Sequence, residues 1–155
     1  MKIISGGQTG VDQAALDAAL ELGIDAGGWC PEGRLCEDGI IPNKYPITEL
    51  PDAGYRKRTK QNVIDSDATL IIYFNTPTGG TKQTINFCIN EKKLYILVDA
   101  KIISPESGAE QTAEFIKKYD ITTLNIAGPR ASTEPNAYKY AKSLTLNLLR
   151  FIANN

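Results

Sequence analysis

The sequence predicts an α/β domain in which a mainly parallel sheet of about five strands has helices on both faces. Three observations lead to this prediction. Strand-like apolar runs alternate with helix-like runs, residues 68–74 (ATLIIYF) form the continuous apolar stretch of a strand buried on both faces, and the order strand, glycine turn, helix occurs twice. With 155 residues the chain is long enough for one such domain and too short for two, so residues 1–155 are expected to form a single domain.

The first strand, turn and helix occupy residues 2–22. Ile3 and Ile4 give the strand its β-branched character, and a turn rich in glycine follows. A helix is expected over residues 11–22, because apolar residues recur there at helical spacing and Gly23 can end it in a left-handed conformation. A helix that starts after such a turn directs unpaired N–H groups at it, which favours an anionic ligand.

The middle of the chain contains a long segment without periodicity. Residues 24–29 are predicted to form a short second strand. Residues 30–45 (CPEGRLCEDGIIPNKY) show neither the helical nor the strand period, so they are expected to form a long surface loop. Loops of this length without regular structure are usually functional lids or disordered segments. Residues 54–67 are then predicted to form a helix that leads into the strand at residues 68–74.

The second glycine turn, residues 75–81 (NTPTGGT), precedes a helix that runs through Cys88 and Ile89. The rest of the chain predicts a strand at residues 94–98, a helix at 108–119, a strand at 123–126 and an amphipathic helix at 134–155. Ligands of such sheets bind beyond the carboxyl ends of the strands, where the winding direction reverses. If residues 2–4 and 68–74 are neighbouring strands, the two glycine turns face each other there; other strand orders stay open.

Composition narrows the choice of partners. The formal net charge of -1 and the pI near 5.5 provide no general attraction to nucleic acid or to a membrane surface, so neither is expected as a partner. No charged and then apolar leader is recognisable, and no apolar run approaches the ~20 residues of a membrane span. These features predict a cytoplasmic protein whose partner is a small ligand.

The chain has no histidine and three cysteines. The lack of histidine excludes histidine-based triads, a histidine general base and most zinc sites. An odd number of cysteines in a domain of this size favours reduced thiols over disulfides. Cys30 and Cys36 lack the spacing and the partners of a zinc site, so no metal site is expected, and we assign no catalytic residue.

The first turn, SGGQTGVD at residues 5–12, matches neither common nucleotide fingerprint. The dinucleotide pattern G-x-G-x-x-G would need glycine at Ser5. The P-loop would need a lysine and a hydroxyl after Gly10, where Val11 and Asp12 stand. What remains is a glycine turn at a helix start, which a purely structural turn also produces.

The second glycine turn strengthens the interpretation of the first as a binding site. Two such turns in one small domain are hard to explain by structure alone, and both offer backbone N–H groups to a ligand. Asp12 has the alternative role of stabilising its helix, and Thr81 that of capping one. The candidate ligand-binding residues of the two turns are Gly6, Gly7, Gln8, Thr9, Gly10 and Asp12, then Gly79, Gly80 and Thr81.

Three further candidates lie between the turns. The run YRKRTK at residues 55–60 concentrates four cations, and most such runs are solvated helix faces. Arg58 and Thr59 differ from their neighbours because they fall near the helix face of Tyr55 and Asn62, where an arginine fork can close on a phosphate. Arg34, in the long loop, is a similar candidate with the alternative of a flexible loop charge.

Several of these segments together resemble the molybdenum carrier family. They are GGQTGVDQAALDAALELG at residues 6–23, GGWCPEGRLCEDG at 27–39, Y-x-x-RT-x-x-NV at 55–63, SDATLI at 66–71 and GGT-x-x-T at 79–84. The family is a branch of the Rossmann-like group that includes the lysine-decarboxylase-like and DprA-like proteins. The likeness covers most of the first hundred residues.

The resemblance implies a Rossmann-like domain that associates into dimers or tetramers. It also implies a ligand, the molybdenum cofactor (molybdopterin), which is a phosphorylated pterin that carries the metal. The residues of the two turns match the ligand loops of the family, and Arg34, Arg58 and Thr59 fall in the motifs between them. On this basis the chain is expected to be a carrier of molybdenum cofactor or of a nucleotide-like phosphorylated ligand.

The related phosphoribohydrolases provide a contrast, since their hallmark is PGG-x-GT-x-x-E. Here the loop reads TPTGGTKQT, and Thr84 stands in the place of the glutamate. Without that carboxylate, the group that would stabilise a sugar cation or position water is missing, which disfavours this activity. Two alternatives to a carrier remain: a hydrolase of a nucleotide or ADP-ribose derivative, with Asp12 or a loop carboxylate as base, and a nucleotide-sensing module without turnover.

Overall fold

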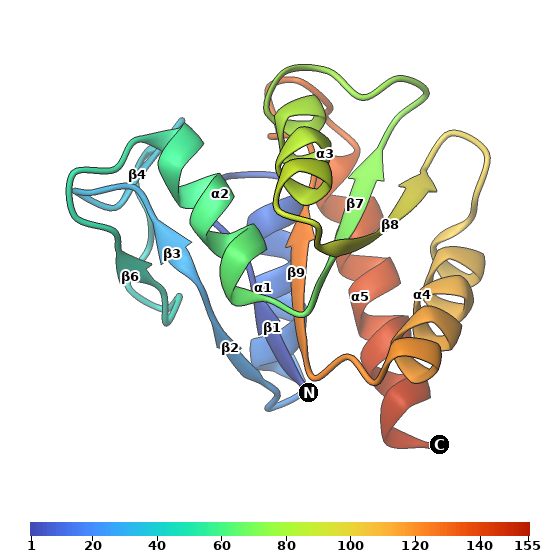
Figure 1. Cartoon of the computed structure of the whole chain (residues 1–155). Coiled ribbons are helices and arrows are strands. Elements are labelled where there is room, and N and C mark those ends of the chain that lie inside the picture. Colours follow the sequence, from blue (N-terminus) through green and yellow to red (C-terminus); the bar gives the residue numbers. More distant parts are fainter.

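The computed structural model describes all 155 residues, and its centre is a parallel sheet of five strands in the order β2-β1-β9-β7-β8. Figure 1 shows the strands side by side with their carboxyl ends at the same edge. Their bounds are β1 Lys2–Ile4, β2 Asp25–Gly27, β7 Ala68–Tyr73, β8 Leu94–Asp99 and β9 Thr123–Ala127. The predicted α/β fold with a mainly parallel sheet is confirmed.

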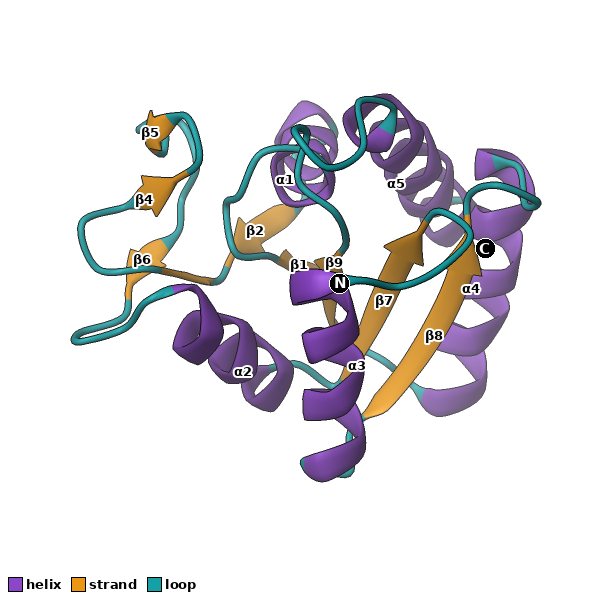
Figure 2. Cartoon of the chain, turned by 90° about the horizontal axis from the view of Figure 1, so that it is seen from above, coloured by secondary structure: helices purple, strands orange, loops and turns teal.

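Five helices cover the two faces of the sheet. Viewed from above, α1, α5 and α4 lie on one face and α2 and α3 on the other, which gives three layers (Figure 2). Their bounds are α1 Val11–Glu21, α2 Tyr55–Asp65, α3 Gly79–Asn90, α4 Pro105–Tyr119 and α5 Ala137–Ala153. None of them combines the length and the apolar character that a membrane span needs.

The core differs between the two faces. A cluster of 19 buried residues joins the sheet to α1, α4 and α5, and α1 contributes to it mainly alanines. Small side chains bring this helix close to the strands. A cluster of four, Val63, Ile71, Phe87 and Cys88, joins the sheet to α2 and α3. The lighter packing on this second face leaves room beside it for polar side chains.

The assumption that β1 and β7 are neighbours is wrong, because β9 lies between them. β9 pairs with β1 from Lys2↔Thr123 and with β7 from Ala68↔Leu124. Asp67 fixes where this strand begins, since its carboxylate accepts hydrogen bonds from the backbone N–H groups of Thr122 and Thr123 at 2.9 and 2.8 Å. The last strand in the sequence therefore occupies the centre of the sheet.

The predicted strand at residues 24–29 is broken at Gly28. β2 ends at Gly27, and β3 (Trp29–Cys30) pairs with β6 (Thr48–Glu49) in a separate small sheet. Gly28 has a φ of +121°, and a Cβ there would lie 2.3 Å from the carbonyl oxygen of Ser5. The strand breaks because the chain turns where only glycine can pass this close to β1.

The loop at residues 30–45 contains more regular structure than expected. A short antiparallel ladder joins β4 (Leu35–Cys36) to β5 (Gly39–Ile40), and a buried cluster that includes Cys30, Ile41 and Tyr45 packs beneath it. The helix predicted at residues 108–119 starts earlier, at Pro105, where the Ser104 hydroxyl accepts a hydrogen bond from the N–H of Ser107. The helix predicted at residues 134–155 starts later, at Ala137.

Candidate functional site

A polar cavity of about 410 Å³ opens at the carboxyl ends of β1, β9 and β7. Its walls come from the first glycine turn, the start of α2, the first two turns of α3 and residues 125–133 at and after β9. The volume lies within the roughly 300–1,000 Å³ typical of small-molecule sites. Although β9 separates β1 from β7, residues of both glycine turns line this one cavity.

Gln8 contributes a fixed hydrogen-bond donor to the inner wall. Its side-chain oxygen accepts hydrogen bonds from the backbone N–H groups of Thr9 at 3.1 Å and Glu37 at 2.9 Å. Because both of these groups are donors, the amide nitrogen must point the other way. That nitrogen, Nε2, is buried and has no hydrogen-bond partner.

Arg58 places a buried guanidinium next to Gln8. Its side chain makes one hydrogen bond, from Nη1 to the Asp12 carboxylate at 3.4 Å, and its Nε is buried without a partner. A Cβ on Gly6 would lie 2.0 Å from Nη1, so Gly6 provides the space in which the guanidinium lies. This long contact leaves most of the arginine fork free to donate to a ligand.

Asp12 is the one carboxylate among the cavity residues. It accepts a hydrogen bond from the N–H of Gln8 at 3.2 Å in addition to its contact with Arg58. Burial raises the pKa of Asp12, and the nearby positive charge of Arg58 opposes that rise. Together with Arg58 and Arg130, it gives the lining a formal charge of about +1, which favours an anionic ligand.

The N-terminus of α1 is occupied by the protein itself. The N–H of Val11 donates to the carbonyl of Pro129 at 3.2 Å, and the N–H of Gln13 donates to the carbonyl of Gln8 at 3.0 Å. Asp12 adds a negative charge in the first turn. The donors and the positive dipole end that we expected to receive an anion here are largely compensated.

The N-terminus of α3 is open by contrast. Its N-cap residue, Thr78, makes no side-chain capping hydrogen bond, and no acceptor in the protein receives the N–H of Gly79 or Gly80. A Cβ on either glycine would meet nothing within 4 Å. Thr81 lies inside the helix and is not its N-cap, so the capping role considered for it is wrong. Uncapped donors at a helix start have the geometry and the charge that favour an anion.

Thr59 and Thr84 line the cavity, and each donates its hydroxyl to its own helix. Thr59 donates to the carbonyl of Tyr55 at 2.8 Å, and Thr84 to the carbonyl of Gly80 at 2.9 Å. Asn62 is also committed, since its amide bonds to both the N–H and the C=O of Trp29. The donors of the cavity that lack partners therefore belong to Gln8, Arg58 and the α3 backbone rather than to these side chains.

The rim of the cavity includes an arginine that was not among the residues predicted from the sequence. The guanidinium carbon of Arg130 lies 5.5 Å from the centroid of the Tyr55 ring, and that of Arg58 lies 5.5 Å from the same ring. Tyr55 thus places two cations beside one cavity. Arg130 stands in the aperiodic segment GPRAST, and its arginine and glycine were the signals that could have marked this segment as part of a site.

Thr9 and Gly10 hold the segment after β9 instead of lining the cavity. The Glu37 carboxylate accepts hydrogen bonds from the hydroxyls of Thr9 and Ser132, and these bonds lower the pKa of Glu37. A Cβ on Gly10 would lie 2.5 Å from the carbonyl oxygen of Pro129. Both residues therefore act on the cavity through the loop that carries Arg130.

Gly7 and Arg34 also lie outside the cavity lining. A Cβ on Gly7 would meet the side chain of Ile47 at 2.5 Å. The Arg34 guanidinium donates to four backbone carbonyls of the long loop, those of Ile41, Pro42, Tyr45 and Ile47, at 2.9 to 3.3 Å. The structure commits Arg34 to holding this loop together.

No thiol or imidazole faces the cavity. All three cysteines are free and buried, and none of them is among the cavity residues. No group of three or more cysteine, aspartate or glutamate side chains that could hold a metal ion is present.

Comparisons with known proteins agree with this architecture. A family model described as "Circularly permutated YpsA SLOG family" matches residues 3–149. A crystal structure of a putative molybdenum carrier protein from Syntrophus aciditrophicus SB is 44% identical, covers 96% of this chain and 94% of that chain, and superposes with a TM-score of 0.93. A comparison with curated proteins found no match.

Proposed function

Because this chain belongs to the circularly permutated YpsA SLOG family, we propose that it carries a phosphorylated, nucleotide-sized ligand in the cavity above β9. The molybdenum cofactor is the first candidate, since the sequence motifs and the name of the similar crystal structure both point to a molybdenum carrier. The proposal includes the site residues Gln8, Arg58, Gly79, Gly80 and Thr81 as ligand contacts.

The observation that carries this proposal is the pair of buried donors without partners. Gln8 Nε2 and Arg58 Nε both belong to side chains that line the cavity. A buried donor that lacks an acceptor costs about 1–3 kcal/mol, and native proteins rarely keep two such groups together. Acceptor atoms on a bound ligand would remove this cost.

The phosphate group fits the opposite wall. The free N–H groups of Gly79 and Gly80 provide donors at the positive end of α3, and Arg130 at the rim adds a cation. The ring system of the ligand would then lie over β9 toward Gln8 and Arg58. In this arrangement the ligand is held only by hydrogen bonds and charge. Such non-covalent contacts allow a carrier to release its ligand as well as to bind it.

Isothermal titration tests the proposal. Molybdopterin should bind saturably, molybdate alone should not, and removal of the phosphate should weaken binding. Arg130→Gln should weaken binding of the phosphorylated ligand about tenfold, because a charge-assisted contact is lost. Arg150→Gln, at the far end of α5, is the matched control and should leave affinity unchanged. Failure of every phosphorylated ligand, including a nucleotide panel, to bind would contradict the proposal.

One observation favours a second function, hydrolysis of a nucleotide or ADP-ribose derivative. Asp12 is a buried carboxylate with a raised pKa that lines the cavity, as a general base would be. Release of ribose or base from such a compound, lost in Asp12→Asn, would establish it. Binding without measurable release would leave the carrier function.

A further inference from the structure

A second cavity, of about 360 Å³, lies between α2 and α3, which are side by side in Figure 1. Arg56 of α2 and one face of α3 line this space, the α2–α3 cavity. It meets the cavity above β9 at the start of α3, because Gly79 and Gln83 line both. Gly79 has no side chain to separate the two spaces, and no atom of another segment lies within 4 Å of the position that its Cβ would take.

The face of α3 that lines the α2–α3 cavity changes in character along the helix. Lys82, Asn86 and Ile89 follow Gly79 at intervals of three or four residues, so they lie along one face. The cation is in the first turn, beside the free N–H groups, and Ile89 lies two turns further on with 55% of its surface exposed. This order matches a ligand that is anionic at the start of α3 and less polar further along it.

The α2–α3 cavity is positively charged. Arg56 and Lys82 line it, and no carboxylate does. Neither cation forms a salt bridge, since the four salt bridges of the structure involve other basic residues, which are Lys44, Arg58, Lys60 and Lys142. The chain as a whole has a net charge of -1, so two unpaired cations beside one cavity are a local concentration of charge that favours an anion.

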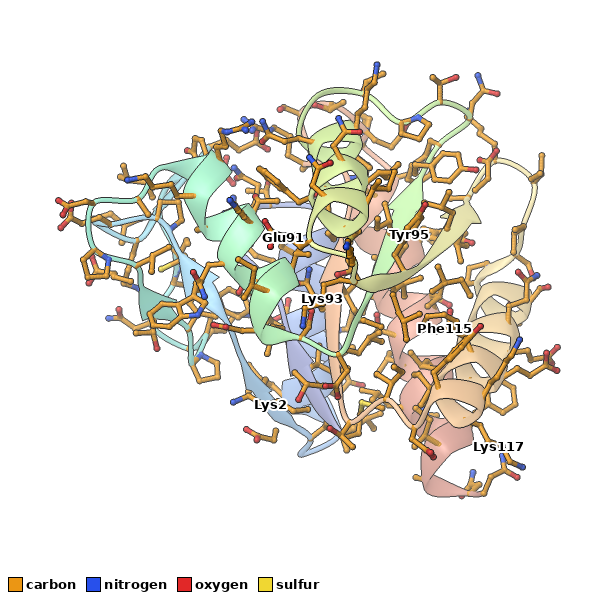
Figure 3. All side chains as sticks on the ribbon, viewed as in Figure 1. Lys2, Glu91, Lys93, Tyr95, Phe115 and Lys117 are labelled. Carbon is orange, nitrogen blue, oxygen red and sulfur yellow. The ribbon has the colours of Figure 1, made fainter.

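An aromatic ring positions Arg56 at this cavity. The guanidinium carbon of Arg56 lies 5.0 Å from the centroid of the Phe87 ring, which belongs to the buried cluster between the sheet, α2 and α3. The acid that follows α3, Glu91, forms a salt bridge with Lys60 at 3.5 Å. Figure 3 shows Glu91 at the end of α3 opposite to its first turn. The two cations of the α2–α3 cavity therefore remain available to a ligand.

We infer that the ligand is a dinucleotide, in which a diphosphate joins one half in the cavity above β9 to a second half in the α2–α3 cavity. This inference rests on the proposed function, which places a phosphate at the free N–H groups of Gly79 and Gly80. The second phosphate then lies on the side of Arg56 and Lys82, and the second half extends along α3 toward Ile89.

The distribution of charge favours two linked phosphates over one. A diphosphate that joins two halves carries one negative charge on each phosphate, so each cavity receives an anion. A monophosphate would place its charge beside Gly79 and leave Arg56 and Lys82 without a partner. The two volumes, about 410 and 360 Å³, each lie within the range of roughly 300–1,000 Å³ of small-molecule sites, so each can hold half of such a ligand.

Isothermal titration with three guanosine compounds tests this inference. They are the monophosphate, the diphosphate and the dinucleotide in which a diphosphate joins two guanosines. The dinucleotide should bind most tightly, because it alone fills both cavities. Arg56→Gln combined with Lys82→Gln should weaken its binding about tenfold and leave that of the monophosphate unchanged. Lys57→Gln combined with Lys60→Gln removes the same charge outside both cavities and should leave all three affinities unchanged.

Ile89→Asn distinguishes the two compounds that contain a diphosphate. It should weaken binding of the dinucleotide about threefold, because an apolar contact is lost, and leave that of guanosine diphosphate unchanged. Equal affinity for these two compounds, with no effect of Ile89→Asn, would overturn the dinucleotide.

Two further outcomes separate this inference from the proposed function. Binding of monophosphates such as molybdopterin, with no gain from a second phosphate and no effect of the Arg56 and Lys82 variants, would overturn the inference and leave the proposed function. Failure of every phosphorylated compound to bind, molybdopterin included, would overturn both.

Discussion

The two glycine turns share the order strand, glycines, helix, but the space around their glycines differs. In the first turn a Cβ on Gly6, Gly7 or Gly10 would come within 2.5 Å of another part of the protein. In the second turn a Cβ on Gly79 or Gly80 would meet nothing within 4 Å. In the first turn, glycine allows other side chains and backbone of the protein to pack closely against it. In the second turn, the space beside the glycines at the start of α3 is empty.

The helices after the two turns differ in the same way. α1 has a carboxylate, Asp12, in its first turn and donates to the carbonyl of Pro129. α3 has no acid in its first turn and no side-chain cap. The same order of strand, glycine turn and helix therefore gives one helix end that the protein compensates and one whose first N–H groups have no partner in the protein.

Alanine at Gly10 should destabilise the protein far more than alanine at Gly80. Gly10 has a φ of +80°, and its Cβ would lie 2.5 Å from one backbone oxygen and 2.8 Å from a backbone nitrogen. Strain and overpacking together predict a loss of about 3 kcal/mol or more in the free energy of unfolding. Gly80→Ala should change it by less than about 1 kcal/mol. Urea unfolding measures the free energy of unfolding of both variants. Equal decreases in Gly10→Ala and Gly80→Ala would contradict the difference between the two turns.

Asp12→Asn should become more stable relative to the wild type as the pH rises. The pKa of Asp12 is raised above 3.8 by burial, so the folded wild type binds its proton more tightly than the unfolded chain does. Its stabilising contribution is fully present below pH 3.8 and is lost as the pH rises through the folded pKa. Asparagine does not titrate, so Asp12→Asn does not lose stability in this way as the pH rises. The urea midpoints of both proteins should be measured from acidic to neutral pH. A difference between the two midpoints that stays constant with pH would contradict the raised pKa of Asp12.

Thr78→Asp should make the second turn resemble the first. A carboxylate at the N-cap of α3 would accept from its free N–H groups and stabilise the protein by about 0.5–1 kcal/mol. The same carboxylate would compete with an anionic ligand and weaken its binding about tenfold. Thr78→Asn is the matched control, since it caps without charge and should stabilise with a smaller loss of affinity. Tighter ligand binding to Thr78→Asp would place the phosphate elsewhere.

Glu37→Gln should have the smallest effect, by loosening the loop that carries Arg130. The variant loses the charge that accepts hydrogen bonds from Thr9 and Ser132, at a cost of about 0.5–1 kcal/mol because the group is partly exposed. The pKa of Glu37 is lowered from 4.5, so its contribution is present above that pH and is lost as the pH falls through the folded pKa. Thermal melts near neutral pH and in acid would show this difference narrowing in acid.

The sequence predicted the elements well where periodicity was strong. α1, α2, β7 and β9 lie within about two residues of their expected bounds. It failed at Gly28 and within residues 30–45, where a close backbone approach and a short ladder depend on contacts with distant segments. Local sequence patterns predict helices and strands, whereas the break of a strand or the formation of a two-residue ladder depends on segments that are distant in the sequence and adjacent in space.

The candidate site divides along the same line. Eight of the residues predicted from the sequence line the cavity: Gly6, Gln8, Asp12, Arg58, Thr59, Gly79, Gly80 and Thr81. Arg34 did not reach it, because four carbonyls of its own loop take its donors. Arg130 was missed because its segment comes near the first turn only when β9 inserts between β1 and β7. Whether these residues bind the ligand stays a prediction.

The fold class, the positions of both glycine turns and the family resemblance could be predicted from the sequence, because each depends on residues close together in the chain. The tertiary structure decided the strand order, the closing of the α1 end by Asp12 and Pro129, and the open end of α3. The strand order and the contact of Pro129 with α1 depend on β9, a strand near the end of the chain that pairs with its beginning. Pairing over such a separation leaves no local pattern from which it could be read.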